Sequence, residues 1–279
     1  MSYTFGSVPA LSIAGMITSG IVALIVPILL LVVWKKKTQS KLSSCFIGCG
    51  TFVVFALVIE SIFHVIFLQH LFPSIMDNIW VFSLYGGFMA GLFEETGRFI
   101  SMKFLMKKNL NKENAIMYGI GHGGIEAILL CSFSEVSNVA TSYAINAGGI
   151  DKIFRSIASS ETRDQLFAQI EPLWALSSDA FFAAGIERMS AIAFHIGASY
   201  LVYKAVKDKK IANYFLAILL HMILDVASMF LSKKDVNVWI IELIVMAFSA
   251  AVIVFVIRDY KNRKEEASVV SLTEPEPEV

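Results

Sequence analysis

Long apolar stretches, separated by short polar segments, follow one another along almost the whole chain. At about 1.5 Å of rise per residue, a helix of roughly 20 residues crosses the hydrocarbon core of a bilayer, so this pattern predicts membrane-spanning helices. The fold class that it indicates is an all-α membrane protein, a polytopic bundle of about seven transmembrane helices in a single domain over residues 1–264. The predicted spans are residues 10–34, 44–70, 79–106, 114–145, 176–203, 211–231 and 238–257.

Three polar segments modify this picture. Residues 151–172 mix acidic and basic side chains without a long apolar run, which predicts an extracytoplasmic loop with an amphipathic helix. Residues 132–149, the last third of the fourth span, are too polar to face lipid, and we expect them to continue as a helix into the outer aqueous layer or against protein. Residues 265–279 are acidic and contain proline, which predicts a disordered cytoplasmic tail.

Composition and charge agree with the membrane class. Hydrophobic residues make up 56% of the chain and charged residues 16%, against about 45–50% and 25% in soluble domains. The net charge of zero is uninformative, but lysines and arginines cluster after the first, third, fifth and seventh spans. Short loops rich in these residues stay in the cytoplasm, which predicts an outside N-terminus and a cytoplasmic C-terminus. The three cysteines lie inside predicted spans and imply no disulfide framework, and nothing indicates a nucleic-acid partner.

Ionisable side chains occur at helical spacing inside four of the predicted spans. An isolated charge in hydrocarbon costs several kcal/mol, so such residues are expected to meet one another and to serve a function. Counted from the cytoplasmic end of each span, most lie roughly 12–21 Å deep, in one layer, and two lie deeper, at roughly 24–26 Å. The layer contains Glu94, Glu95, Arg98, His122, Glu126, His195, His221 and Asp225, and the deeper pair is Glu187 and Arg188.

Carboxylates beside imidazoles can activate water. One glutamate takes a proton as general base, one histidine stabilises or shuttles it, and a second donates hydrogen bonds to the developing oxyanion. Arg98 keeps its proton and is expected to be a charge partner. Glu126 and Asp225 are expected to orient His122 and His221, or a histidine on the next helix. The same inventory could instead hold zinc or another divalent metal, with His122, His195, His221 and Glu94 as ligands.

Other functions use similar side chains. A proton-coupled transporter or channel could use Glu94, Glu126 and Asp225 as a relay, because intramembrane carboxylates also mark ion pathways. A metal-dependent lipid hydrolase of seven-span type is a further alternative. The absence of GxSxG and GxGD motifs argues against serine and aspartyl intramembrane proteases, and HExxH is also absent. His64, which lies one helical turn after Glu60, is expected to make an interhelical hydrogen bond only.

The order of the motifs resembles a known superfamily. The stretch GGFMAGLFEETGR, the FH pair at His195 and the LLHMILD element are similar to the CAAX-protease and bacteriocin-processing superfamily of intramembrane glutamic proteases. The layout is closer to its bacterial YhfC branch, with the PrsW branch as a relative, and covers residues 86–225. Two details differ: Arg98 follows the first glutamate by four residues instead of five, and Ala191 stands where the FxxxH motif has phenylalanine.

The resemblance implies an intramembrane endopeptidase that hydrolyses a peptide bond of a membrane-associated protein or peptide in the bacterial plasma membrane. It implies Glu94 as general base and His221 with Asp225 as the oxyanion-binding group, and His122 is an alternative histidine. We expect a water-accessible cavity open toward the cytoplasmic half. A non-catalytic immunity or scaffold role would use the same fold. The predicted catalytic residues are Glu94, Glu95, His195 and His221, and the supporting residues are Arg98, His122, Glu126, Glu187 and Asp225, with a divalent metal such as zinc as an optional cofactor.

Overall fold

The computed structural model describes residues 3–263, which form helices joined by short connections, with no strand among them. The predicted tail at residues 265–279 lies outside the described residues. Each predicted span corresponds to one continuous helical segment, which confirms the all-α membrane fold. These segments are α1 (Ala10–Thr38), α2 to η2 (Leu42–Leu71), α4 (Ile79–Ile100) with η4 (Ser101–Leu105), α5 (Lys112–Ala127) with η5 (Ile128–Ser132) and α6 (Phe133–Asn146), α10 (Ser178–Lys207), α11 (Ala212–Lys233) and α12 (Val238–Asn262).

Five of these segments are long and apolar enough to cross a membrane: Ala10–Thr38, Leu42–Leu71, Lys112–Asn146, Ala212–Lys233 and Val238–Asn262. The remaining two, α4 and α10, each carry several charged residues, among them Glu94, Glu95 and Arg98 on α4 and Glu187 and Arg188 on α10, which lowers their average hydropathy. Their charged residues are covered by neighbouring helices instead of lipid, as expected for helices in a bundle interior. The count of seven spans therefore stays a prediction.

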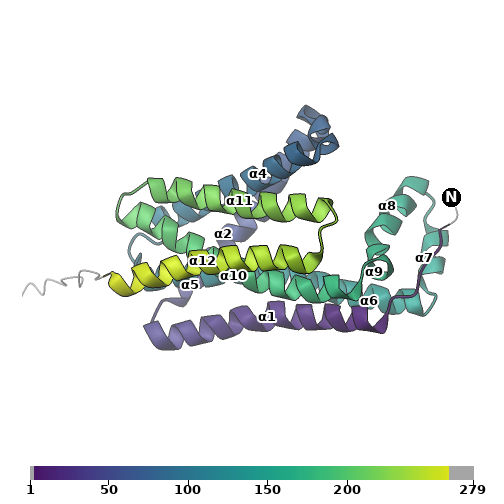
Figure 1. Ribbon diagram of the computed structural model, residues 1–279, viewed down its shortest axis with the longest axis horizontal. Coiled ribbons are helices and arrows are strands. Elements are labelled where there is room, and N and C mark those ends of the chain that lie inside the picture. The colour runs from purple at the N-terminus through teal and green to yellow at the C-terminus, as the bar shows by residue number, and fades with distance from the viewer. Residues whose placement is uncertain (1–2, 264–279) are drawn as a thin grey trace, which may run out of the picture.

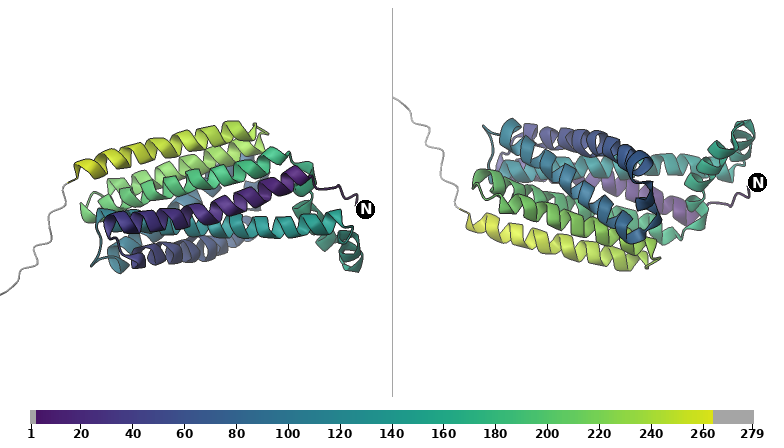
Figure 2. Two further views of the ribbon diagram at one scale, coloured as in Figure 1. Left: turned by 90° about the horizontal axis from the view of Figure 1, so that it is seen from below. Right: turned by 90° about the horizontal axis from the view of Figure 1, so that it is seen from above.

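Helix α10 lies at the centre of the bundle and packs against α1, α5 and α12, while α4 packs along α11. The long helices run nearly side by side, and α4 tilts away from the others toward its N-terminal end (Figures 1 and 2). Glycines bring the backbones of α4 and α11 together, as is common between membrane helices. A Cβ added at Gly87 or at Gly91 would lie 2.8 Å from a carbonyl oxygen of α11.

The interface between α2 (Leu42–Phe52) and α5 is closer still. A Cβ added at Gly121 would lie 2.1 Å from the carbonyl oxygen of Cys45, and neither backbone can move without shifting its helix. We expect Gly121→Val to lower the free energy of unfolding by about 2–3 kcal/mol, because overpacking of a tight interface forces the helices apart. Thermal unfolding in detergent micelles measures this. Gly50→Ala is the matched control, since nothing lies within 4 Å of that Cβ, and equal melting temperatures for the two variants would contradict the prediction.

The end of the molecule beyond α6 is built from short helices. The predicted loop with an amphipathic helix forms three short helices, α7 (Ile150–Ser156), α8 (Ser160–Ile170) and α9 (Pro172–Ala175). The reason is an aromatic cluster in which Phe5 packs against Phe154, Phe167 and Trp174, which requires the chain to fold back on itself. The polar end of the fourth predicted span is helical, as α6, and reaches these short helices (Figure 1).

Candidate active site

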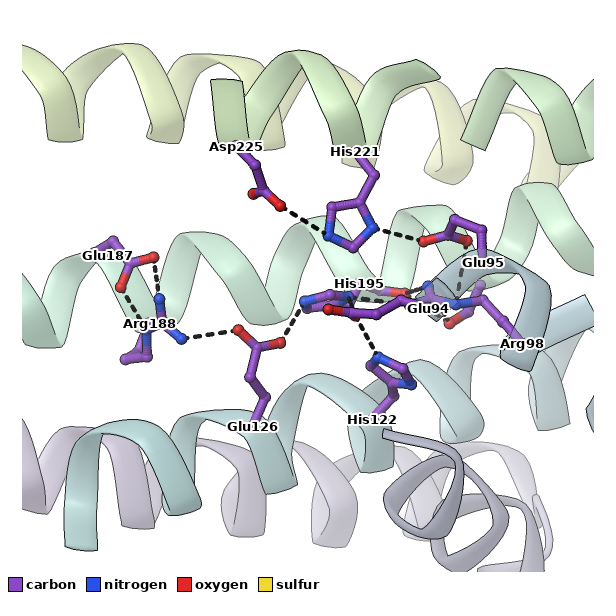
Figure 3. A network of polar contacts seen from close by, with 11 residues as sticks. Glu94, Glu95, Arg98, His122, Glu126, Glu187, Arg188, His195, His221 and Asp225 are labelled. Carbon is purple, nitrogen blue, oxygen red and sulfur yellow. Dashed lines mark hydrogen bonds and ion pairs between the residues drawn. The ribbon is translucent and has the colours of Figure 1, made fainter. Parts of the chain in front are cut away.

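The structure brings the polar residues of α4, α5, α10 and α11 into one connected group (Figure 3). Most of these side chains are buried, and Glu95, Arg98 and His122 are fully inaccessible to solvent. The residues of the predicted polar layer therefore contact one another. It contains Glu94, Glu95, Arg98, His122, Glu126, His195, His221 and Asp225, and it extends through Arg188 to Glu187.

Glu94 faces two histidines from different helices. Its Oε2 lies 2.9 Å from Nε2 of His122 and 3.9 Å from Nδ1 of His195. Because an ionised carboxylate only accepts, we assign the proton of the shorter contact to His122 Nε2. The alternative histidine suggested by the sequence, His122, thus makes the shorter contact to Glu94.

His221 is held by the second glutamate of the pair. Its Nδ1 lies 2.9 Å from Oε1 of Glu95, and the other oxygen of Glu95 lies 3.3 Å from Nε of Arg98. Arg98 also donates to the carbonyl oxygen of His195, at 2.8 Å, and to the hydroxyl of Ser199, at 3.0 Å. Arg98 is a charge partner for Glu95, as predicted. Its further bonds join α4 to α10.

His195 is held by a carboxylate from another helix. Its Nε2 lies 2.5 Å from Oε2 of Glu126, and its Nδ1 lies 3.0 Å from Nη2 of Arg98. Glu126 therefore contacts the histidine of the next helix instead of His122, which was one of the two arrangements that the sequence left open. Arg188 donates to the second oxygen of Glu126 at 2.8 Å and pairs with Glu187.

Asp225 pairs only loosely. Its Oδ2 lies 3.5 Å from Nε2 of His221, and its side chain retains 34% of its accessible surface. No arginine or lysine forms an ion pair with Asp225 within the described part of the chain. This carboxylate is thus the one in the group that is most available to water or substrate.

A cavity of about 370 Å³ adjoins the group. On α4 its lining runs from Glu94 back to Gly86, and on α11 it runs from His221 forward to Met229. On α4 this direction leads away from the lysines that follow the helix, and on α11 it leads toward Lys233. The predicted opening toward the cytoplasmic half stays a prediction. The N-terminal half of α4, which carries Gly86, tilts away from the other long helices (Figure 2).

Residues 22–245 match the YhfC intramembrane metalloprotease family. The chain belongs to this family. A relative from Bacillus subtilis (strain 168), named "Uncharacterized membrane protein YhfC", is 34% identical over 243 residues, which cover 86% of this chain and 93% of the relative. No solved structure matches the chain. The predicted resemblance to the YhfC branch is confirmed, and the family supports a membrane protease in general terms.

The YhfC family name implies a metal, and three side chains of the group could hold one. Glu94, His195 and His221 each offer one ligand atom, and these atoms lie within 4.8 Å of one another. Two histidines and a glutamate are a known ligand set of catalytic zinc. The other nitrogen of each histidine meets a carboxylate, Glu126 or Glu95, which is the usual outer-shell partner of a metal-bound imidazole. The donor set and its carboxylate partners fit a divalent metal, with His122 outside the three ligands. Nη2 of Arg98 lies 3.0 Å from Nδ1 of His195, and it would turn away from that nitrogen when a metal binds.

In this YhfC-family chain, one further polar pair lines the cavity. Nε2 of His64 lies 3.1 Å from Glu60, and its Nδ1 lies 3.0 Å from the hydroxyl of Tyr85 on α4. The predicted interhelical hydrogen bond of His64 is confirmed. The position of Glu60 and His64 in the cavity lining was not predicted. The available signal was a glutamate and a histidine four residues apart in an otherwise apolar helix.

Proposed function

We propose that this chain is an intramembrane endopeptidase that uses a divalent metal of the zinc class, held by Glu94, His195 and His221. Its substrate is a peptide bond of a membrane-associated protein or peptide. The observation that carries the proposal is the convergence of these three ligands, each histidine backed by a carboxylate, beside a cavity of about 370 Å³. The proposed setting is the bacterial plasma membrane, with the N-terminus outside and the C-terminus in the cytoplasm.

A bound divalent metal lowers the pKa of a water molecule and polarises a carbonyl group. The chain's own residues prepare the site for that chemistry. Glu95 and Glu126 fix which nitrogen of His221 and of His195 carries the proton, and thereby turn the opposite nitrogen toward the ligand group. His122 holds Glu94 in place through its Nε2.

Proton transfer needs a group that is free of strong partners. Asp225 meets this requirement, since its single ion-pair contact among the described residues is the 3.5 Å approach to His221 and a third of its side chain is accessible. We assign to it the transfer of one proton from the attacking water to the amide nitrogen. A carbon–oxygen bond forms, the carbon–nitrogen bond breaks, and the carboxylate returns to its starting state.

The cavity supports a peptide substrate in the membrane. By volume it could hold on the order of ten water molecules, which is enough for a short stretch of unwound chain. A peptide bond inside a helix has its polar groups paired, so a substrate must unwind locally, and it can do so only where polar groups replace the lost bonds. The lining offers such groups in the carboxylates and histidines, next to apolar walls formed by Phe194, Leu224 and Val245.

Metal content and chelation test the proposal. We expect purified protein to contain about one equivalent of zinc or a similar metal, and to cleave members of a quenched fluorescent peptide library in proteoliposomes. Treatment with 1,10-phenanthroline should abolish cleavage, and added zinc should restore it. Cleavage that survives complete removal of metal would contradict the metal centre and favour a glutamic-type mechanism with Glu94 as general base. Proton flux without cleavage would favour a transporter.

A further inference from the structure

Two arginine–glutamate–histidine series of contacts end at the proposed metal ligands. In the first, Arg98 holds Glu95, and Glu95 holds His221. In the second, Arg188 holds Glu126, and Glu126 holds His195 (Figure 3). The first series lies within the EETGR motif and the sixth predicted span. The second series runs from Arg188 on α10 to Glu126 on α5 and back to His195 on α10. Arg188 lies outside the motifs that carry the family resemblance.

The contacts between Arg188, Glu126 and His195 are short. Arg188 donates from Nη1 to Oε1 of Glu126 at 2.8 Å, and the other oxygen of Glu126 lies 2.5 Å from Nε2 of His195. Nε and Nη2 of Arg188 donate to the carboxylate of Glu187. Glu126 is 8% exposed and His195 is 3% exposed, so water cannot easily replace either partner. Arg188 is therefore the one cation in contact with Glu126 among the described residues.

We propose that Arg188 is a positioning residue that acts through Glu126 to set the metal affinity of His195. This inference rests on the proposed function, because it requires His195 to be a metal ligand. Arg188 fixes the direction of the Glu126 carboxylate through its 2.8 Å bond. The carboxylate in turn orients the imidazole of His195 and supports it as a ligand.

Removal of the guanidinium has a defined consequence. Without Arg188, the buried carboxylate of Glu126 loses the donor that fixes its direction, and it turns toward another partner. His195 then loses the contact that orients its ring. Loss of an outer-shell partner of this kind lowers metal affinity by about 10- to 100-fold.

Zinc affinity of the full-length protein in detergent micelles, measured by competition with a fluorescent chelator, tests the inference. We expect Arg188→Gln to weaken zinc binding about 10- to 100-fold, and Arg188→Lys, which keeps the charge but not the planar fork, to weaken it less. Glu126→Gln should match Arg188→Gln. The double variant should bind zinc no more weakly than Glu126→Gln alone, because an effect that passes through Glu126 cannot be added to its removal.

Glu135→Gln is the matched control. Glu135 is another buried glutamate, 7% exposed, on α6, where its recorded bond is from Asn138, and zinc affinity should not change. Wild-type affinity in Arg188→Gln, or additive losses in the double variant, would overturn the inference while leaving the metal centre intact. Wild-type protein that binds no zinc would overturn the metal centre and, with it, this inference. If Arg188→Gln does not fold, as shown by thermal unfolding without zinc, Arg188→Lys decides the outcome.

Discussion

Glu94→Gln is expected to lower peptide cleavage by roughly 10³-fold or more while the protein stays folded. Glu94 lies 2.9 Å from His122 and within the ligand group of His195 and His221, so every chemical role considered for the site passes through its carboxylate. The amide of glutamine has almost the same shape and can still accept a hydrogen bond from His122. The measurement is cleavage of a library peptide that the wild-type protein hydrolyses, in proteoliposomes.

The same variant separates the two mechanisms. If Glu94 is a metal ligand, the variant should lose bound zinc along with its activity. If Glu94 is the general base of a metal-free site, cleavage should be lost and the metal content should not change. Glu135→Gln again serves as the control, because it removes a buried carboxylate that is bonded to Asn138 and forms no ion pair with the group, and it should leave turnover intact. Unchanged turnover in Glu94→Gln would reject both roles.

The helical fold was predictable because hydrophobic length determines which segments can cross a bilayer. The seven helical segments begin and end within a few residues of the predicted spans. The polar layer was predictable for a similar reason, since charged residues at helical spacing and equal depth have to meet. The sequence thus implied that Glu94, Glu95 and His221 lie in one group, but it did not imply that Glu95, instead of Asp225, would hold His221 most closely.

The sequence did not reveal which histidine each glutamate of the polar layer contacts. The spacing of His122 and Glu126 places them on one face of α5, yet Glu126 contacts His195 and His122 contacts Glu94. That choice depends on how α5 is rotated against α10, which the close approach of Gly119 and Gly123 to α10 determines. A single sequence gives the period of a helix but not its rotation against a neighbour.

The shape and lining of the cavity could not be predicted for a related reason. The sequence shows where charges lie along each span, but the cavity depends on how far the helices separate. The splayed N-terminal half of α4 places Gly86 at the cavity wall, and the helix before it adds Glu60 and His64. Those two residues lie in a helix that alternates between α-helical and π-helical turns, a local change that hydropathy does not reveal and that often accompanies functional sites.

Arg98→Met is expected to produce the largest loss of stability in this group, about 3–5 kcal/mol in the free energy of unfolding. Arg98 and Glu95 are fully buried, and the guanidinium also donates to the carbonyl oxygen of His195 and to Ser199. Methionine fills much of the same volume but leaves Glu95 as a buried charge without a cation. Reversible denaturation in detergent micelles measures the change, and Arg155→Met, at an exposed position on α7, should alter the free energy by no more than about 0.5 kcal/mol.

A double variant shows whether charge or packing causes that loss. In Glu95→Gln with Arg98→Met, no uncompensated carboxylate remains, so part of the stability lost in Arg98→Met alone should return. His221 would still lose its ionised partner, and cleavage should therefore stay low even where the fold recovers. Stability in the double variant as low as or lower than in Arg98→Met would show that Arg98 contributes through its bonds to α10 and not through the charge of Glu95. If stability recovers but cleavage does not, Glu95 and Arg98 have two roles: they support the helix packing and they orient His221.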